Sequence, residues 1–413
     1  KPFDVGFDEL NQNAFLFGTT GAGKTVTLFG IADLFISANY PLVFIDGKGD
    51  DNNFRAEDGS IIYNEKAKYE TLKRMAQKTG KKVFTFNCGD FASYDFLSDG
   101  TPSEITSRIV CLGMGSDTSA AEYYTDIDQN ILSIIVMILI ELGDSITIEA
   151  VLELCDVETI KEVSSTLENK RITKAVSYSQ HIETKSIAGL KNKLLKIYLC
   201  DLYEFLDGEK HGFRLRDVIE NNDIAYFSLE NLSSPRLAEM MAQLIINDFK
   251  SCIKYNVNRK PIGLILDEFS VYAGEQAVAT ATQTRGMGGH TIIASQDVSG
   301  IEKKTSKAFV DNMLNNCNFL LVQGMTGTYD RELLAKEFGT YDTFDVTTQI
   351  GSQDREGGAT DITGMGSVRS IEKPRVNPND IMKLKAGQGF VKRRTGSIEH
   401  LYGAKIAINN KLT

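Results

Sequence analysis

A glycine-rich octapeptide near the start of the chain, Gly18–Thr25, limits the possible folds more than any other segment. It fits the pattern G-x-x-x-x-G-K-[ST] at every fixed position. Before it, the apolar run Ala14–Phe17 predicts a strand, and after it Lys24–Ser37 carries apolar residues at helical spacing. A strand, a glycine loop and a helix in this order predict a phosphate-binding loop rather than a chance glycine-rich turn.

The residue types in this loop suit the binding of phosphate groups. Glycines let successive backbone N–H groups turn toward phosphate oxygens at a helix N-terminus. We expect Lys24 to reach the β- and γ-phosphates and Thr25 to offer its hydroxyl to Mg²⁺. The candidate nucleotide-binding residues are Gly18, Thr19, Thr20, Gly21, Ala22, Gly23, Lys24 and Thr25.

A second motif lies at Ile262–Phe269, where four apolar residues lead into the pair Asp267-Glu268. At the end of a strand, Asp267 could hold Mg²⁺ through water, and Glu268 could polarise a water molecule against the γ-phosphate. An adjacent Asp-Glu pair is typical of hydrolytic ATPases. The alternative is a strand end with solvated acidic residues, which the phosphate loop in the same chain disfavours.

Two further candidates follow in the segment Thr282–Gln296. Gln296, at the end of the next predicted strand, could sense the γ-phosphate or orient the attacking water. Arg285, at the end of a helix, could reach the nucleotide of a neighbouring subunit in a ring and stabilise transition-state charge. An ordinary surface arginine is the alternative for Arg285.

Short apolar runs alternate with helical segments through most of the chain, which predicts an α/β fold with a mostly parallel sheet. The residues from about 101 to 211 instead have apolar residues at helical spacing, and we interpret them as a helical insertion. Glycine, serine, threonine and aspartate dominate Asp345–Arg369, which predicts a long loop. We expect a hairpin at the sheet edge, formed by 389–394 and 401–408.

The net charge of −10 and the pI near 5.1 mean that any contact with DNA needs a local basic surface. The six cysteines form no C-x-x-C pair, which argues against a zinc site and against a disulfide framework. The most apolar stretch, Ile131–Ile140, predicts a buried helix because it is shorter than the ~20 residues that cross a membrane. The candidate DNA-contacting set, which could equally be a solvated sheet edge, is Lys383, Lys385, Lys392, Arg393 and Arg394.

Four segments in order resemble the RecA-like, additional-strand conserved-glutamate P-loop ATPases of the FtsK/HerA group. More narrowly, they resemble the TraG/TraD-type coupling proteins of type IV secretion and conjugation. More than 200 residues separate Thr25 from Asp267, which is similar to that family, in which an all-α domain interrupts the nucleotide-binding domain. The four segments are Phe17–Thr25, Phe44–Asp50, Leu264–Phe269 and Gly288–Gln296.

The resemblance implies a role for each candidate site residue. Lys24 and Thr25 would bind ATP and Mg²⁺, and Asp267 would support the metal. Glu268 would be the catalytic base, Gln296 the sensor and Arg285 a finger acting in trans. Asp46–Asp50 follows a predicted strand and could also line the nucleotide site, or could be a charged turn.

The resemblance also implies partners and a cellular place. We expect a hexameric ring on the cytoplasmic face of the bacterial inner membrane, delivering DNA, single-stranded and with a relaxase, or protein substrates to a type IV secretion channel. The chain begins at Lys1 rather than Met, so we expect a fragment that lacks the N-terminal transmembrane helices of the family. The expected nucleotide-binding domain comprises residues 1–100 and 213–413, interrupted by an all-α domain at 101–212.

Two other functions remain open at this point. One keeps the motor fold but makes the protein a DNA translocase of the FtsK/HerA kind. The other makes it a docking platform for protein cargo, in which the helical insertion binds the cargo and the nucleotide site is a slow switch. The acidic net charge slightly favours the platform, because a DNA pump is expected to have a basic channel.

Overall fold

Within the described residues, a nine-stranded sheet forms the centre of the molecule, in the order β13-β12-β9-β1-β8-β7-β2-β6-β5. Seven of these strands are parallel, and β12 and β13 add an antiparallel edge. The predicted α/β class with a mostly parallel sheet is confirmed. The computed structural model describes residues 5–11, 13–49, 54–55, 61–62, 67–86, 93–112, 119–179, 184–200, 203–206, 212–229, 235–350, 362–393 and 398–401.

The strands form where short runs of apolar residues predict them. Each parallel strand is buried or nearly so, as expected when helices cover both faces of a sheet. The strands are β1 (Ala14–Phe17), β2 (Leu42–Asp46), β5 (Val83–Phe86), β6 (Ile224–Ser228), β7 (Ile262–Asp267), β8 (Gly289–Ser295), β9 (Phe319–Gln323), β12 (Gly389–Lys392) and β13 (Ile398–Leu401).

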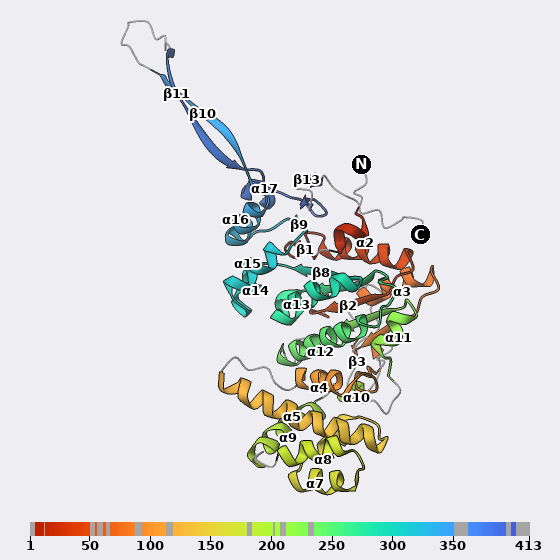
Figure 1. The fold of residues 1–413 in the computed structure, drawn as a ribbon. Helices are drawn as coiled ribbons and strands as arrows, with labels where there is room; N and C mark the ends of the chain where they lie inside the picture. The colour runs from red at the N-terminus through yellow and green to blue at the C-terminus, as the bar shows by residue number, and fades with distance from the viewer. Residues whose placement is uncertain are drawn as a thin grey trace.

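Successive residues of each strand enter two different hydrophobic clusters, because side chains alternate between the faces of a sheet. Leu16 belongs to the cluster built with α2 (Lys24–Ser37) and α3 (Lys68–Gln77). Phe17 belongs to the cluster built with α12 (Pro235–Ile253) and others. Figure 1 shows α2 and α12 on opposite sides of the strands.

Between Thr101 and Leu206 the described residues form only helices and their connections. The predicted buried helix at Ile131–Ile140 is confirmed as part of the 24-residue α5, although Ile140 itself is 44% exposed. Among the described residues, no helix has both the length and the apolar character that a membrane crossing requires. The helices of this segment are α4 (Pro102–Cys111), α5 (Ser119–Leu142), α6 (Ile148–Glu153), α7 (Val157–Thr166), α8 (Lys170–Tyr178), α9 (Thr184–Tyr198) and α10 (Tyr203–Leu206).

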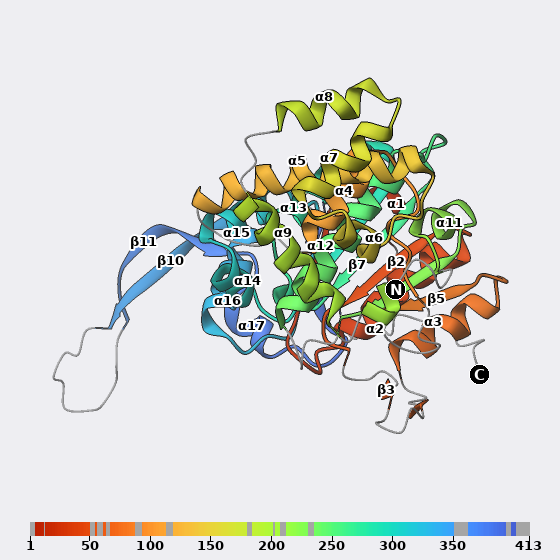
Figure 2. The ribbon, with the colours of Figure 1, turned by 90° about the horizontal axis from the view of Figure 1, so that it is seen from below.

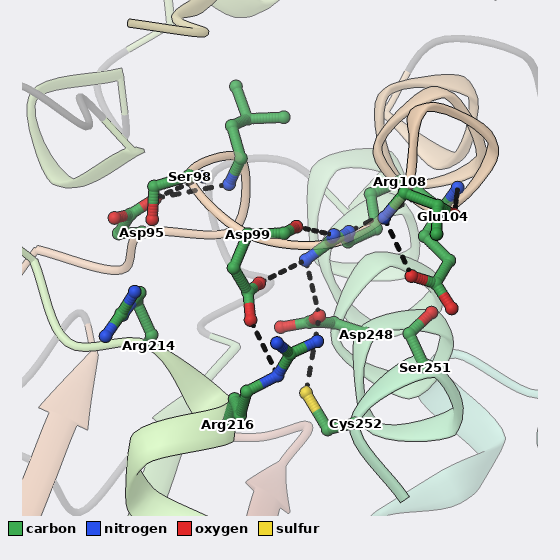
Figure 3. A network of polar contacts seen from close by, with 12 residues as sticks. Asp95, Ser98, Asp99, Glu104, Arg108, Arg214, Arg216, Asp248, Ser251 and Cys252 are labelled. Atoms are coloured by element: carbon green, nitrogen blue, oxygen red, sulfur yellow. Dashed lines mark hydrogen bonds and ion pairs between the residues drawn. The ribbon is translucent and has the colours of Figure 1, made fainter. Parts of the chain in front are cut away.

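A buried ionic network joins this helical segment to the sheet layer (Figure 3). Arg108 on α4 is 1% exposed, and its Nη1 lies 2.8 Å from Asp248 Oδ1 on α12 and 3.3 Å from Asp99 Oδ1. Arg216, from α11 (Leu215–Glu220), pairs with the other oxygen of Asp99 at 2.8 Å. The Tyr94 hydroxyl donates to Asp248 Oδ2 at 2.5 Å. The network therefore fixes α4 against α12 and α11.

The prediction of a long loop over Asp345–Arg369 is wrong for the described part of that segment. β10 (Thr340–Ile350) pairs antiparallel with β11 (Ile362–Pro374), and this ribbon extends away from the body in both Figure 1 and Figure 2. Glycine and serine are frequent in the segment, but most residues of β10 are β-branched or aromatic, which favours strand pairing. Phe344 remains 70% exposed, since no described residue of the body covers the ribbon.

The predicted hairpin at the sheet edge is present, with a different second strand. Gly389–Lys392 pairs with Ile398–Leu401, three residues earlier than the expected start of the returning strand at Leu401. The rest of the expected second strand, residues 402–408, lies outside the described residues. A short helix, α17 (Pro378–Met382), precedes the hairpin, and its N-cap Asn377 accepts a hydrogen bond from Asn379 N.

Candidate active site

The glycine loop connects the end of β1 to the first residue of α2, as the sequence predicts. Its backbone is tied to the neighbouring strands, because Gly18 N donates to Ser295 O at 3.3 Å and Thr19 N donates to Gly324 O at 2.9 Å. Gly23 has φ +104°, a left-handed conformation that favours glycine, and a Cβ there would lie 3.0 Å from Gly387 N. The loop therefore needs glycine for both its conformation and its close packing.

Lys24 is 6% exposed and lies beneath this loop. Its Nζ donates to Gly18 O at 2.7 Å and lies 4.0 Å from Glu268 Oε1. Burial lowers the pKa of Lys24, against the opposing effect of Glu268 and Asp267. An ammonium group has three donors. Lys24 makes one hydrogen bond to the described residues and keeps donors for phosphate oxygens.

Glu268 and Gln296 meet at the carboxyl ends of β7 and β8. Gln296 Nε2 donates to Glu268 Oε1 at 2.9 Å, and Gln296 Oε1 accepts from Thr20 Oγ1 at 3.1 Å. Glu268 has φ +53° and ψ +46°, a conformation that is uncommon for a residue other than glycine. Such strain costs about 1–3 kcal/mol and persists where the surroundings hold it. The result is a continuous chain of contacts from the glycine loop to the acidic pair.

Asp267 and Asp46 are opposite each other on the adjacent parallel strands β7 and β2. Lys68 Nζ lies between them, 2.9 Å from Asp46 Oδ1 and 2.9 Å from Asp267 Oδ2. Burial alone would lower the pKa of Lys68, but Asp46 and then Asp267 raise it well above its ordinary value. Burial raises the pKa of Asp267, and Lys68 opposes that change. The segment Asp46–Asp50, which the sequence suggests could line the nucleotide site, therefore borders the site through Asp46, whereas Asp50 lies outside the described residues.

The sequence interpretation missed Lys68 and Tyr226, whose hydroxyl donates to Asp46 Oδ2 at 2.6 Å. One signal could have identified Lys68. It occupies a position on the apolar face of α3, four residues before Leu72 and seven before Met75, where a lysine has to be buried. Tyr226 has no such signal, because a tyrosine in a buried strand is ordinary.

Arg285 lies far from the glycine loop of its own chain. It forms the C-cap of α13 (Glu275–Thr284) and is exposed. It precedes β8, whereas Gln296 follows β8, and a seven-residue strand spans about 20 Å. Its position therefore excludes direct contact with a nucleotide in the same subunit. The role in trans stays a prediction.

Three of the four described members of the candidate DNA-contacting set are paired with acidic residues, whereas Lys385 is exposed and forms no ion pair with the described residues. Lys383 Nζ lies 3.3 Å from Asp380, Lys392 Nζ lies 3.4 Å from Glu337, and Arg393 forms an ion pair with Glu9. Arg394 lies outside the described residues. These pairings favour a solvated edge of the sheet over a free basic surface.

Two oxygen donors near the glycine loop suit a Mg²⁺ ion. Thr25 follows Lys24 in the first turn of α2, and Asp267 lies at the end of β7. Mg²⁺ takes oxygen ligands and commonly combines one or two protein groups with substrate phosphates and water. Thr25 and Asp267 therefore fit the metal that a nucleoside triphosphate brings with it.

These features define the class of the protein. The mostly parallel sheet, the glycine loop between β1 and α2 and the acidic pair after β7 are those of a RecA-like P-loop nucleotide-binding protein. The family model of the type IV secretion-system coupling protein DNA-binding domain matches residues 103–401. The chain belongs to that family, which confirms the predicted resemblance. The match begins after the glycine loop, so the loop is an additional, independent feature.

Solved structures with the same fold cover nearly the whole chain. The bacterial conjugative coupling protein TrwBdeltaN70 in complex with sulphate has a TM-score of 0.66 at 14% identity, covering 96% of this chain and 86% of that chain. TrwB in complex with ADP and Mg²⁺ has a TM-score of 0.63 at 14% identity, covering 93% and 83%. VirB4 of Thermoanaerobacter pseudethanolicus has a TM-score of 0.57 at 14% identity, covering 94% and 88%. No curated protein matches the chain.

Proposed function

We propose that this chain is the ATPase domain of a type IV secretion coupling protein, which hydrolyses ATP to deliver DNA, or protein substrates, to a secretion channel. One observation carries the proposal: Lys24, Glu268 and Gln296, from three different elements, form one connected set beside the glycine loop. Membership of the coupling-protein family supports the transport task. The titles of similar structures name ADP with Mg²⁺ and a non-hydrolysable ATP analogue as ligands of TrwB.

Each of these residues has a separate role in the proposed hydrolysis of ATP. Lys24 and the backbone N–H groups of the loop bind the phosphates and neutralise charge that develops on the γ-phosphate. Glu268 Oε1 is held by Gln296, and the other carboxylate oxygen has no hydrogen-bond partner among the described residues, so it can accept a proton from the attacking water. Thr25, and Asp267 through water, would hold Mg²⁺, which would supply electrostatic stabilisation of the phosphates.

The same proposal includes the division into domains. Residues 1–100 and 213–413 would form the nucleotide-binding domain, and 101–212 an inserted all-α domain. The purely helical character of the described part of that segment supports the division. The insertion is not isolated, because its apolar residues belong to the hydrophobic cluster that also covers one face of the sheet. Motion of the sheet layer could therefore reach the insertion.

Assembly and cellular place are further parts of the proposal. A homo-hexameric ring on the cytoplasmic face of the inner membrane would bring Arg285 of one subunit to the nucleotide of the next. The exposed position of Arg285, at the sheet edge opposite its own glycine loop, supports this arrangement. Single-stranded DNA with a relaxase, protein substrates and the secretion channel are the proposed partners.

The test is ATP hydrolysis by this chain with and without single-stranded and double-stranded DNA, over a salt series. We expect DNA to stimulate hydrolysis, and the stimulation to weaken as salt rises because phosphate contacts release counterions. Glu268→Gln should lower turnover about 10²–10⁴-fold while nucleotide still binds, since it removes the general base. Lys24→Ala should lose nucleotide binding as well.

Matched controls separate these effects from general damage. Glu158→Gln and Lys78→Ala change exposed residues far from the glycine loop in sequence and should leave turnover unchanged. Absence of hydrolysis in the wild-type chain, with nucleotide bound, would contradict the ATPase proposal. Hydrolysis without any DNA response would favour the platform for protein cargo, and movement along duplex DNA without a secretion partner would favour an FtsK/HerA-like translocase.

A further inference from the structure

Lys68 occupies a point where two carboxylates would otherwise repel each other. Asp46 and Asp267 are direct neighbours at the ends of two parallel strands, and their side chains are 1% and 2% exposed. Two negative charges repel each other strongly when both are buried and nearby. The Lys68 ammonium contacts both at 2.9 Å, so its positive charge offsets the repulsion between them and holds them in their present positions.

The Asp267 carboxylate is fixed at both oxygens. Oδ1 accepts a hydrogen bond from Glu268 N at 2.9 Å, and Oδ2 accepts from Lys68. Asp46 is fixed in the same way, because Oδ1 also accepts from Lys48 N at 3.1 Å and Oδ2 accepts from Tyr226. Hydrogen bonds and ion pairs thus connect Tyr226 on β6, Asp46 on β2 and Lys68 to Asp267 on β7, the aspartate proposed to support the metal.

We propose that Lys68 is a positioning residue for the hydrolysis of ATP: it holds Asp267 in the orientation in which that carboxylate accepts a hydrogen bond from a Mg²⁺-bound water. This inference rests on the proposed function. A buried ion pair is weak grounds for a role in stability, because apolar residues of similar size often replace one at little cost. Its place beside the acidic pair gives it another task, since groups that orient the ligands of a metal contribute to affinity and activity.

The experiment measures how much Mg²⁺ tightens the binding of a fluorescent ADP analogue, together with turnover of ATP. In Lys68→Met we expect the gain in ADP affinity on adding Mg²⁺, and the turnover, each to fall about 10–100-fold. Binding without Mg²⁺ should stay as in the wild type, because Lys24 and the loop are untouched. Lys68→Arg should recover part of both losses, as it keeps the positive charge.

Lys78→Met is the matched control, because Lys78 directly follows α3 and is exposed. If Lys68→Met does not fold, the double variant Asp46→Asn/Lys68→Met removes one of the two repelling charges and still leaves Asp267 without its cation. We expect the same loss of the Mg²⁺ effect in that variant.

The outcomes separate the two proposals. A wild-type Mg²⁺ effect and turnover in a folded Lys68→Met protein, or in the double variant, would overturn the role of Lys68 and leave the ATPase proposal intact. A wild-type chain that does not hydrolyse ATP would overturn the ATPase proposal instead. A loss in both Lys68→Met and Lys78→Met would also overturn the inference, since the effect would not be specific to the buried position.

Discussion

Two buried cations in this molecule are each held between two carboxylates, but their surroundings differ. Lys68 bridges the ends of β2 and β7 beside the glycine loop. Arg108 bridges Asp99 and Asp248 at the base of the helical segment (Figure 3). All three guanidinium nitrogens of Arg108 are hydrogen-bonded, with further bonds from Nε to Glu104 O and from Nη2 to Asp99 O.

The comparison teaches that burial of a charge does not by itself indicate a functional site. The planar fork of an arginine matches several fixed acceptors at once, which suits a closed structural network. Among the described residues, the network around Arg108 shares no member with the contacts that lead to the glycine loop. Lys68 instead contacts Asp267, whose neighbour Glu268 lies 4.0 Å from Lys24. What distinguishes the two cations is that Lys68 lies beside the proposed nucleotide site and Arg108 does not.

The largest effect is expected for Arg108→Met, which tests whether the Arg108 network has only a structural role. The variant leaves Asp248 buried without its cation, so we expect the free energy of unfolding to fall by about 3–5 kcal/mol. Turnover of ATP per folded molecule should not change, in contrast to Lys68→Met. Denaturant unfolding and ATP hydrolysis, normalised to the folded fraction, measure the two quantities.

Arg171→Met provides the control, because Arg171 is exposed on α8, and it should leave both quantities unchanged. A folded Arg108→Met protein with wild-type stability would mean that the network is dispensable. Reduced turnover in folded molecules would mean that the two cations are coupled and that the distinction between them does not hold.

The sequence predicts most of the fold because its signals are local. Apolar runs locate every parallel strand, and the glycine loop, the acidic pair after β7 and Gln296 after β8 each follow a strand end. The carboxyl ends of parallel strands lie at one edge of a sheet, so these motifs can be expected to lie together. The structure places Lys24, Glu268 and Gln296 in one connected set at that edge.

What the sequence does not predict depends on long-range pairing. Lys68 contacts Asp267, which is 199 residues away, and Arg108 contacts Asp248, which is 140 residues away. No local pattern specifies such partners. The β10–β11 ribbon was missed for a related reason: its stability depends on which residues face each other across two strands, such as Val346 and Val368, and composition does not show this.

A smaller loss of stability is expected when the N-cap of α4 is removed. Thr101 caps α4, and its Oγ1 accepts a hydrogen bond from Glu104 N at 3.3 Å. Thr101→Ala should lower the free energy of unfolding by about 1 kcal/mol, the usual value for an N-cap, without an effect on turnover. Thr173→Ala, which changes an exposed threonine within α8, is the control and should be neutral or slightly stabilising, because alanine has the higher helix propensity. A loss as large as that of Arg108→Met would mean that the cap, rather than the arginine, holds α4 in place.

The smallest expected effect concerns Glu104 and depends on pH. Burial alone would raise the pKa of Glu104, but hydrogen bonds from Thr101 and the ion pair with Lys254 lower it overall. Because the folded pKa lies below the unfolded value of about 4.3, the carboxylate stabilises the folded state above that pH, and the contribution is lost as pH falls through the folded pKa. Glu104→Gln should therefore destabilise the protein by about 0.5 kcal/mol near pH 7, since Lys254 is half exposed.

Urea unfolding at pH 7, 5 and 4 tests this expectation. The difference in the free energy of unfolding between Glu104→Gln and the wild type should be unchanged between pH 7 and 5 and begin to shrink at pH 4. A difference that grows on acidification would mean that the carboxyl, and not the carboxylate, is favoured by the folded state.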